Sequence, residues 1–348
     1  MTRRDGVKPI SLALQGGGAH GAFTWGVLDR LLQDERIAIA GITGTSAGAM
    51  NAVVLAAGLA KGDPEEARHA LAQFWKDVSR DGRMSPIQRS AFDRLMGNWS
   101  LAKNPVYLAF EVASRFLSPY DFNPLNINPL REILEAHVDF EAIRQAQVKV
   151  KVFISATNVH TGRARIFGHE EMTADAVMAS ACLPFLFQAV EIDGVPYWDG
   201  GYMGNPPLFP LYEMADADDI LLVQINPVVR DTTPRTASEI QNRINEITFN
   251  ASLLAQLRAI DNAAKLIEQG LISRWTLGGS PFRRVRLHRI GGEHQLAALD
   301  ATSKLNAEWS FLQHLRDLGR AAAESFLSEH FDDLGRRSTL DLRLELAD

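Results

Sequence analysis

The sequence contains a single cysteine, Cys182, among its 348 residues. One cysteine excludes an internal disulfide framework and any metal site built from several cysteines, and it fits a reducing compartment. Long hydrophobic runs are also missing, because no stretch approaches the ~18 continuous apolar residues that span a membrane. The apolar stretch at 9–14 is too short for a secretory signal. We therefore expect a cytoplasmic protein whose contact with a membrane, if any, is peripheral.

An excess of basic residues is absent as well. The chain has 36 Lys and Arg against 42 Asp and Glu, a formal net charge of -6, whereas a nucleic-acid-binding protein would carry a basic footprint. Nucleic acid is therefore not an expected partner. With 46% hydrophobic residues the chain is able to bury a large core, and it shows neither repeats nor a low-complexity linker.

Buried strands alternate with helices in the first two thirds of the chain, which favours an α/β fold with helices on both faces of a sheet. After residue 236 the pattern is mostly helical, although one short strand interrupts it. The predicted strands are 9–15, 37–44, 148–157, 219–225 and 284–290, with a hairpin over 190–197 that turns at Asp193-Gly194; the main predicted helices are 64–79, a periodic segment at 236–272, and 303–331. The charged tail after Asp332 is expected to be loosely held.

The pentapeptide Gly44-Thr45-Ser46-Ala47-Gly48 is the most informative motif. It joins a predicted strand to a small-residue helix, and this is the context of a nucleophilic serine on a sharp turn. The flanking glycines Gly44 and Gly48 allow the strand and the helix to pass close to each other. The helix N-terminus adds a partial positive charge where an oxyanion would form. Ser46 is the candidate nucleophile, and the alternative is an ordinary strand–helix turn.

A glycine-rich loop, Gly16-Gly17-Gly18-Ala19-His20-Gly21, follows the first predicted strand. Its bare backbone N–H groups are candidate donors to an oxyanion. The loop also satisfies G-x-G-x-x-G, which is the fingerprint of a dinucleotide site. That fingerprint requires an acidic residue after the second strand, and here the second strand runs into Ser46 instead.

The candidate base is Asp199, which directly follows the predicted hairpin and precedes Gly200-Gly201. An aspartate before two glycines is also a common turn former. His294 lies in a predicted loop after a strand, so a Ser-Asp-His order is a formal alternative. The sequence offers no cluster of metal ligands.

The three motifs, in this order, resemble the patatin-like phospholipases over roughly residues 10–210. A further block at 179–187 is similar to the family's segment before the aspartate. The resemblance implies a three-layer sandwich around a mostly parallel sheet, a Ser46–Asp199 dyad without histidine, an oxyanion hole in the glycine loop, and no metal or cofactor. The implied site residues are Ser46 and Asp199 as the dyad, Gly16, Gly17 and Gly18 as the oxyanion hole, and Gly21, Gly44, Gly48, Gly200 and Gly201 as motif positions.

Two features depart from or extend this resemblance. The family usually has Arg or Lys where His20 stands, so a fixed positive charge near the glycine loop is not assured. Residues 80–120 are rich in basic and aromatic side chains. Such a segment suits a lid or a patch that meets anionic lipid headgroups, and the alternative is a helical insertion packed on the core.

We therefore expect a catalytic core at 8–235 with a lid or insert at 80–130. A helical C-terminal region at 236–335 is expected to pack on this core and to be followed by a tail at 336–348. The expected activity is hydrolysis of fatty-acyl esters of phospholipids, lysophospholipids or related lipids. Two alternatives stay open, an acyltransferase that uses the same serine and a lipid-surface binding protein without activity.

Overall fold

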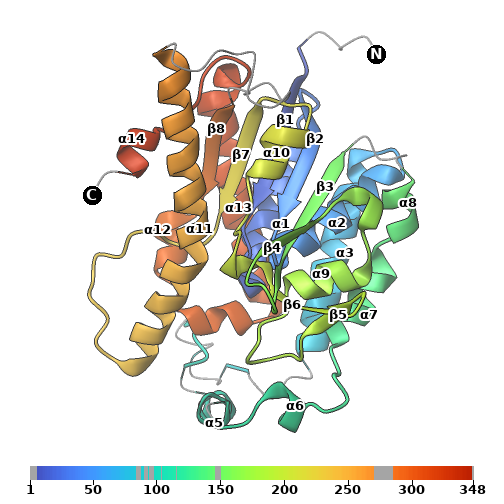
Figure 1. Cartoon of the computed structure of the whole chain (residues 1–348), viewed down its shortest axis with the longest axis vertical. Coiled ribbons are helices and arrows are strands. Elements are labelled where there is room, and N and C mark those ends of the chain that lie inside the picture. The colour runs from blue at the N-terminus through green and yellow to red at the C-terminus, as the bar shows by residue number, and fades with distance from the viewer. Residues whose placement is uncertain are drawn as a thin grey trace.

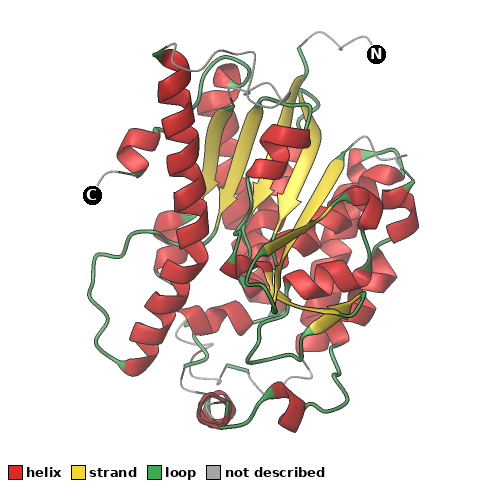
Figure 2. Ribbon diagram, viewed as in Figure 1, coloured by secondary structure: helices red, strands yellow, loops and turns green. Residues whose placement is uncertain are grey.

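A mostly parallel sheet forms the centre of the computed structural model (Figures 1 and 2). The strands lie in the order β5-β6-β3-β2-β1-β7-β8, and β4 pairs with β3 outside this path. The pairs β3–β2, β2–β1, β1–β7 and β7–β8 are parallel, whereas the pairs of β3 with β4 and β6, and of β5 with β6, are antiparallel. The strands are β1 (Lys8–Leu14), β2 (Ile37–Gly44), β3 (Lys151–Asn158), β4 (Ala164–Phe167), β5 (Val190–Ile192), β6 (Val195–Asp199), β7 (Asp219–Gln224) and β8 (Arg286–Gly291). The structure describes residues 6–83, 88–89, 93, 98–102, 104–114, 116–145, 150–269 and 285–346.

Helices cover both faces of the sheet, so the molecule has three layers. On β7, Leu221 and Val223 pack with α1 (Gly21–Leu32), α2 (Ala47–Ala60), α3 (Pro64–Gly82) and α13 (Trp309–His330). The alternate residues Ile220 and Leu222 pack on the opposite face with α10 (Phe209–Met214) and α11 (Ala237–Glu268). Successive side chains of a strand point to opposite faces, and both faces here are apolar because both are covered. The expected three-layer fold is confirmed.

Smaller helices lie around these layers. They are α5 (Pro105–Ala113), α6 (Pro119–Phe122), α7 (Pro129–His137), α8 (Phe140–Arg144), α9 (Ala174–Ser180), α12 (Glu293–Ala297) and α14 (Leu342–Glu345). The arrowheads of β2 and β7 point toward the end of the molecule where α5 and α6 lie (Figures 1 and 2). Within the described ranges, no helix combines the length and the apolar character needed to cross a bilayer.

The predicted helix at 303–331 is wrong at its start. Residues Ala301–Leu305 form a 3₁₀ turn, and α13 begins only at Trp309. The side chain of Asp300 accepts the backbone N–H of Ser303, and the side chain of Asn306 accepts that of Glu308. Such side-chain to backbone bonds compete with a continuous helix and favour turns and caps.

The prediction of a loosely held C-terminal tail is also wrong. The backbone N–H groups of Thr339 and Leu340 both donate to the carbonyl of Leu287 in β8, at 3.1 and 3.0 Å. Leu334 is buried in the main core. The tail therefore covers the edge of β8, where unpaired backbone groups of an outer strand would otherwise be exposed.

The C-terminal region contributes to the sheet itself. Its strand β8 pairs in parallel with β7 over residues Arg286–Gly291. The division into a core at 8–235 and a packed region at 236–335 stays a prediction, and residues 270–284 lie outside the described part of the chain.

Candidate active site

Ser46 occupies the turn between β2 and α2. Its backbone has φ 54° and ψ −121°, a conformation that a residue with a side chain adopts only under strain. The turn is held by two bonds: the Ser46 N–H donates to the hydroxyl of Ser180 at 2.9 Å, and the Gly48 N–H donates to the Thr45 carbonyl at 2.8 Å. Strain of this kind persists only where the surroundings enforce it, and it is typical of functional turns.

The two glycines of the pentapeptide make this turn possible. A Cβ atom at Gly44 would lie 2.5 Å from the carbonyl oxygen of Gly48, and one at Gly48 would collide with the carbonyl of Leu14. Strand and helix therefore pass so close behind Ser46 that any side chain would separate them.

Asp199 ends β6 and is held by its backbone as well as by its carboxyl group. Its N–H donates to the Cys182 carbonyl at 2.7 Å, and its carbonyl accepts the Thr157 hydroxyl at 2.8 Å. The Oδ1 atom accepts the N–H of Gly201 at 2.7 Å. Only 1% of the residue is exposed, so a carboxyl group is fixed in an environment with little water.

Burial raises the pKa of Asp199 to about 7, although hydrogen bonds from the Gly201 N–H and from the Ser46 side chain act in the opposite direction. The Ser46 side chain thus lies close enough to this carboxyl group to lower its pKa. Loss of water around a carboxylate disfavours its charged form. A carboxyl group with a pKa near neutrality is suited to take up and return a proton.

The glycine-rich loop lies directly against Ser46. A Cβ atom at Gly16 would come within 2.7 Å of the Thr45 carbonyl and 2.8 Å of the Ser46 Cβ. Gly16 donates its N–H to Oδ1 of Asn205 at 2.7 Å and accepts the Nδ2 group of Asn226 at 2.7 Å. Its N–H is therefore already engaged. The N–H groups of Gly17 and Gly18 have no hydrogen-bond partner among the described residues.

Polar side chains behind the loop hold it in place, and the sequence motifs gave no sign of them. The Gln15 carbonyl oxygen Oε1 accepts the N–H groups of Ile225 and Asn226, each at 2.9 Å. Gln15 also donates to Oδ1 of Asn250 on α11 at 3.1 Å. One available signal is that Gln15 and Asn226 follow the carboxyl ends of the neighbouring strands β1 and β7, the edge at which open α/β sheets build their sites.

The C-terminal region closes the loop from the other side. Gly18 has φ +59°, and a Cβ atom there would lie 2.5 Å from the carbonyl of Lys304. The His20 Nε2 atom lies 2.7 Å from the Ser303 hydroxyl. Burial, with further contributions from Lys304 and Arg230, lowers the pKa of His20 to about 3. His20 is therefore neutral, and it supplies no fixed charge to the loop.

The other predicted positions are placed as follows. Gly21 packs against Ala47, since a Cβ atom there would come within 2.7 Å of the Ala47 Cβ. Gly200 and Gly201 approach Ser155 and Phe249 too closely for any side chain. The side chain of His294, the alternative base, lies outside the described part of the structure.

The strained serine, the buried carboxyl group and the glycine loop together define a candidate serine-dependent hydrolase. The model of the family described as patatin-like phospholipase matches residues 12–212, which is more than half of the chain. The chain belongs to this family.

One curated relative and two solved structures illustrate what the chain is similar to. A cGAMP-activated phospholipase of Pseudomonas aeruginosa is 31% identical over 218 residues, which are 58% of this chain and 56% of the relative. The chain thus aligns with little more than half the length of that relative. VipD of Legionella pneumophila is 14% identical, with a TM-score of 0.35 over 88% of this chain and 66% of VipD. The type III effector ExoU of Pseudomonas aeruginosa is 13% identical, with a TM-score of 0.34 over 92% of this chain and 53% of ExoU.

Proposed function

We propose that the protein is a lipid acyl hydrolase that cleaves fatty-acyl ester bonds of phospholipids or lysophospholipids, with Ser46 and Asp199 as its catalytic dyad. One observation carries the proposal. The Ser46 side chain lies close enough to a buried carboxyl group to act on its pKa, and that pKa is about 7. Membership of the patatin-like phospholipase family supports the same chemistry and a lipid substrate.

The reaction takes place in two steps. In the first, Asp199 takes the proton of the Ser46 hydroxyl while the oxygen attacks the ester carbonyl carbon. The tetrahedral intermediate then expels the alcohol, which leaves with that proton, and an acyl-serine remains. In the second, Asp199 takes a proton from water and the resulting hydroxide attacks the acyl-serine. Asp199 then returns this proton to the Ser46 oxygen as the fatty acid leaves, which restores the free Ser46 hydroxyl. Because only the ionised carboxylate accepts a proton, the rate should rise with pH through about 7.

The donors to the tetrahedral oxyanion are the N–H groups of Gly17 and Gly18, assisted by that of Ala47 at the start of α2. This refines the expectation that all three loop glycines donate. The N–H of Gly16 is bonded to Asn205, so Gly16 anchors the loop and does not serve as a donor. Loss of one oxyanion donor typically costs ~10²–10³ in rate.

An apolar surface near the proposed site supports a lipid substrate. Between residues 105 and 127 the described large apolar side chains are unusually exposed, and they lie on and around α5 and α6. They include Val106, Leu108, Val112, Phe116, Leu117, Tyr120, Phe122, Leu125 and Ile127, with exposed fractions of 40–83%. Exposed apolar groups gathered in this way are typical of surfaces that bind a membrane or a protein. We name these nine residues the apolar rim.

The apolar rim is connected to the segment that holds Asp199. Cys182 accepts the N–H of Asp199, and a few residues later the side chain of Gln188 donates to the Asn123 carbonyl at 2.8 Å. By contrast, Trp99 in the same insert packs against Phe311 with 4.9 Å between ring centroids. Among the described residues of the 80–130 segment, those of the apolar rim are therefore exposed, whereas Trp99 is packed on the core.

Ester hydrolysis by purified variants tests the dyad. Ser46→Ala and Asp199→Asn should each abolish release of fatty acid from phospholipid vesicles, and both variants should keep a cooperative unfolding transition. The exposed turn residue Asp193 provides a matched control, since Asp193→Asn makes the same chemical change away from the site. Wild-type activity in Asp199→Asn would reject the dyad.

Two further arms of this assay address substrate and regulation. Replacing Phe116 and Leu125, exposed by 83% and 80%, with serine should weaken hydrolysis of vesicles and spare hydrolysis of a short soluble ester. Equal effects on both substrates would reject the apolar rim as a lipid contact. Addition of cGAMP tests whether the activation named for the Pseudomonas relative extends to this chain, and an unchanged rate would confine it to that relative.

The two alternatives are separated by products and labelling. An acyltransferase would pass the acyl group from Ser46 to an added alcohol or thiol, so absence of that product rejects it. A pure lipid-binding protein would not react with a serine-directed fluorophosphonate, whereas the proposed hydrolase should be labelled at Ser46.

A further inference from the structure

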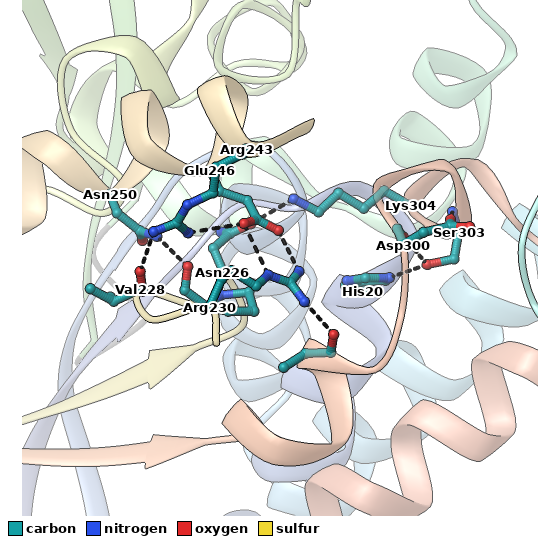
Figure 3. A network of polar contacts seen from close by, with 12 residues as sticks. His20, Asn226, Val228, Arg230, Arg243, Glu246, Asn250, Asp300, Ser303 and Lys304 are labelled. Carbon is teal, nitrogen blue, oxygen red and sulfur yellow. Dashed lines mark hydrogen bonds and ion pairs between the residues drawn. The ribbon is translucent and has the colours of Figure 1, made fainter. Parts of the chain in front are cut away.

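A lysine from the C-terminal region lies against the glycine-rich loop, although no sequence motif marks it. Lys304 belongs to the 3₁₀ turn Ala301–Leu305, whose backbone packs on Gly18. Its ammonium group donates to Oδ1 of Asn226 at 2.8 Å. Figure 3 shows this side chain reaching across from the Ser303 side of the network toward Asn226 and Glu246.

The lysine supports one orientation of the Asn226 amide. An ammonium group only donates hydrogen bonds, so the amide must present its oxygen to Lys304. The Nδ2 group then faces the other way, and it donates to the carbonyl of Gly16 at 2.7 Å and to Oε1 of Gln15 at 3.2 Å. A flipped amide would set its oxygen against both of these acceptors, so Lys304 reinforces an orientation that the loop itself also favours.

The carbonyl of Gly16 and the N–H of Gly17 belong to the same peptide unit. This unit is trans, so it is planar and its C=O and N–H point in opposite directions. Holding the Gly16 oxygen toward Asn226 therefore aims the Gly17 N–H away from it. A hydrogen bond to the carbonyl also polarises the peptide and makes its N–H a stronger donor.

The charges around Lys304 leave it with a positive excess. Glu246 on α11 binds Arg230 at 2.5 Å and Arg243 at 3.1 Å, and the described residues include no carboxylate in direct contact with Lys304. His20, which faces the same space, is neutral because its pKa is lowered to about 3. The three cations Lys304, Arg230 and Arg243 thus lie around a single carboxylate, that of Glu246, beside the loop (Figure 3).

We infer that Lys304 is a positioning residue for the proposed hydrolysis, which acts through Asn226 to hold the Gly16–Gly17 peptide with its N–H directed at the oxyanion. The inference rests on the proposed function. It assigns to the C-terminal region the fixed positive charge that His20 does not give to the loop. The positive excess also favours an anionic transition state over the neutral ester.

Two substitutions test this relay at different points. Lys304→Met removes the charge and keeps an unbranched side chain of similar length. Asn226→Asp keeps an oxygen for Lys304 but removes the donor to Gly16. Each should lower kcat by about 10- to 100-fold, which is below the loss expected for removal of a donor itself. KM should stay within about twofold, because the relay acts on the transition state and not on ground-state binding.

The double variant separates a relay from two independent packing defects. In a relay the second substitution has nothing left to break, so Lys304→Met with Asn226→Asp should be no slower than the slower single variant. Multiplying losses in kcat would overturn the inference. Lys61→Met, at the exposed C-terminus of α2, is the matched control and should retain wild-type kcat.

The pH profile gives a readout that a packing role would not change. Burial lowers the pKa of Lys304 to about 8, although Glu246 acts in the opposite direction. Wild-type kcat should therefore decline above pH 8 as the charge is lost, and Lys304→Met should show no such decline. An unchanged alkaline limb in that variant would contradict the inference.

Unfolding curves and a Ser46→Ala reference distinguish a misfolded variant, a failure of the proposed function and a failure of the relay. Glu246 retains both arginines in Lys304→Met, so the variant should keep a cooperative transition; if it does not, Asn226→Asp alone decides. If wild type shows no Ser46-dependent hydrolysis, the proposed function is refuted. If wild type is active and Lys304→Met matches Lys61→Met, only the relay is refuted.

Discussion

Replacing Asp199 with Asn should abolish activity and yet make the folded protein more stable at pH 8. The carboxyl group is 1% exposed and its pKa is raised from 3.8 to about 7 by burial. A raised pKa means that the folded state resists ionisation of this group. At pH 8 the wild type must keep the buried charge, whereas a neutral amide carries none and is still able to accept the N–H of Gly201.

The expected gain in free energy of unfolding follows from the shift in the pKa of Asp199. A difference of about three pKa units, at 1.36 kcal/mol each, gives roughly 4 kcal/mol as the upper value. The sign follows from proton binding. Between pH 3.8 and about 7 the folded state holds a proton that the unfolded state has released, so wild-type stability falls as the pH rises through this window. The advantage of Asp199→Asn should therefore be near zero below pH 4, grow between pH 4 and 7, and stay constant above.

Urea unfolding followed by tryptophan fluorescence at pH 5 and pH 8 measures this difference. The gain in free energy of unfolding at pH 8 should exceed that at pH 5 by about 2–3 kcal/mol. Asp193→Asn changes an exposed carboxylate and should show no such pH-dependent gain. A variant no more stable than wild type at pH 8, or a gain that is the same at both pH values, would refute the assignment of a buried, costly charge at Asp199.

Two further predictions concern positions outside the proposed dyad. Gly200→Ala should destabilise the fold by about 1–3 kcal/mol in urea, because the new Cβ would collide with the Ser155 carbonyl; Gly168→Ala, where nothing lies within 4 Å, should be near neutral, and equal effects would contradict the packing argument. Asp219→Asn should cost about 3 kcal/mol at pH 7, because it leaves the Arg286 guanidinium without the carboxylate that it binds at 3.0 and 2.8 Å. Burial acts to raise the pKa of Asp219, but its hydrogen bonds, that of His288 first among them, lower it overall. The loss of stability in Asp219→Asn should therefore shrink as the pH falls below about 4. A loss of stability that does not depend on pH would reject this account.

The strands of this fold are readable from the sequence because their residues are apolar on both faces. The predicted strand at 37–44 coincides with β2; the one at 9–15 differs from β1 by one residue at each end, and the one at 219–225 differs from β7 by one residue at its end. Boundaries set by side-chain caps are less readable. Leu305 fits the helical period of the following segment, yet it is 43% exposed and precedes α13, because capping bonds from Asp300 and Asn306 favour a turn.

In the candidate site, too, some residues could be predicted from the sequence and others could not. Ser46 and Asp199 stand in motifs whose glycines are dictated by close backbone approach, so the ordered motifs and their family resemblance were sufficient to mark them as candidates. Asn205, Asn226 and Lys304 are single polar residues in separate loops, and nothing local in the sequence distinguishes them from solvated residues. Their relation to the loop exists only once the sheet has brought the ends of β1 and β7 together.

The C-terminal third is therefore best understood as part of the proposed catalytic unit. The family match ends at residue 212, yet Asn250 and Lys304, which lie beyond it, bind the residues that hold the glycine loop. A loop of three glycines has little conformational preference of its own, and an oxyanion site requires donors fixed before the charge develops. The glycine-rich loop must therefore be held rigid by the residues around it. Much of this support comes from the C-terminal third of the chain, which the sequence motifs do not include.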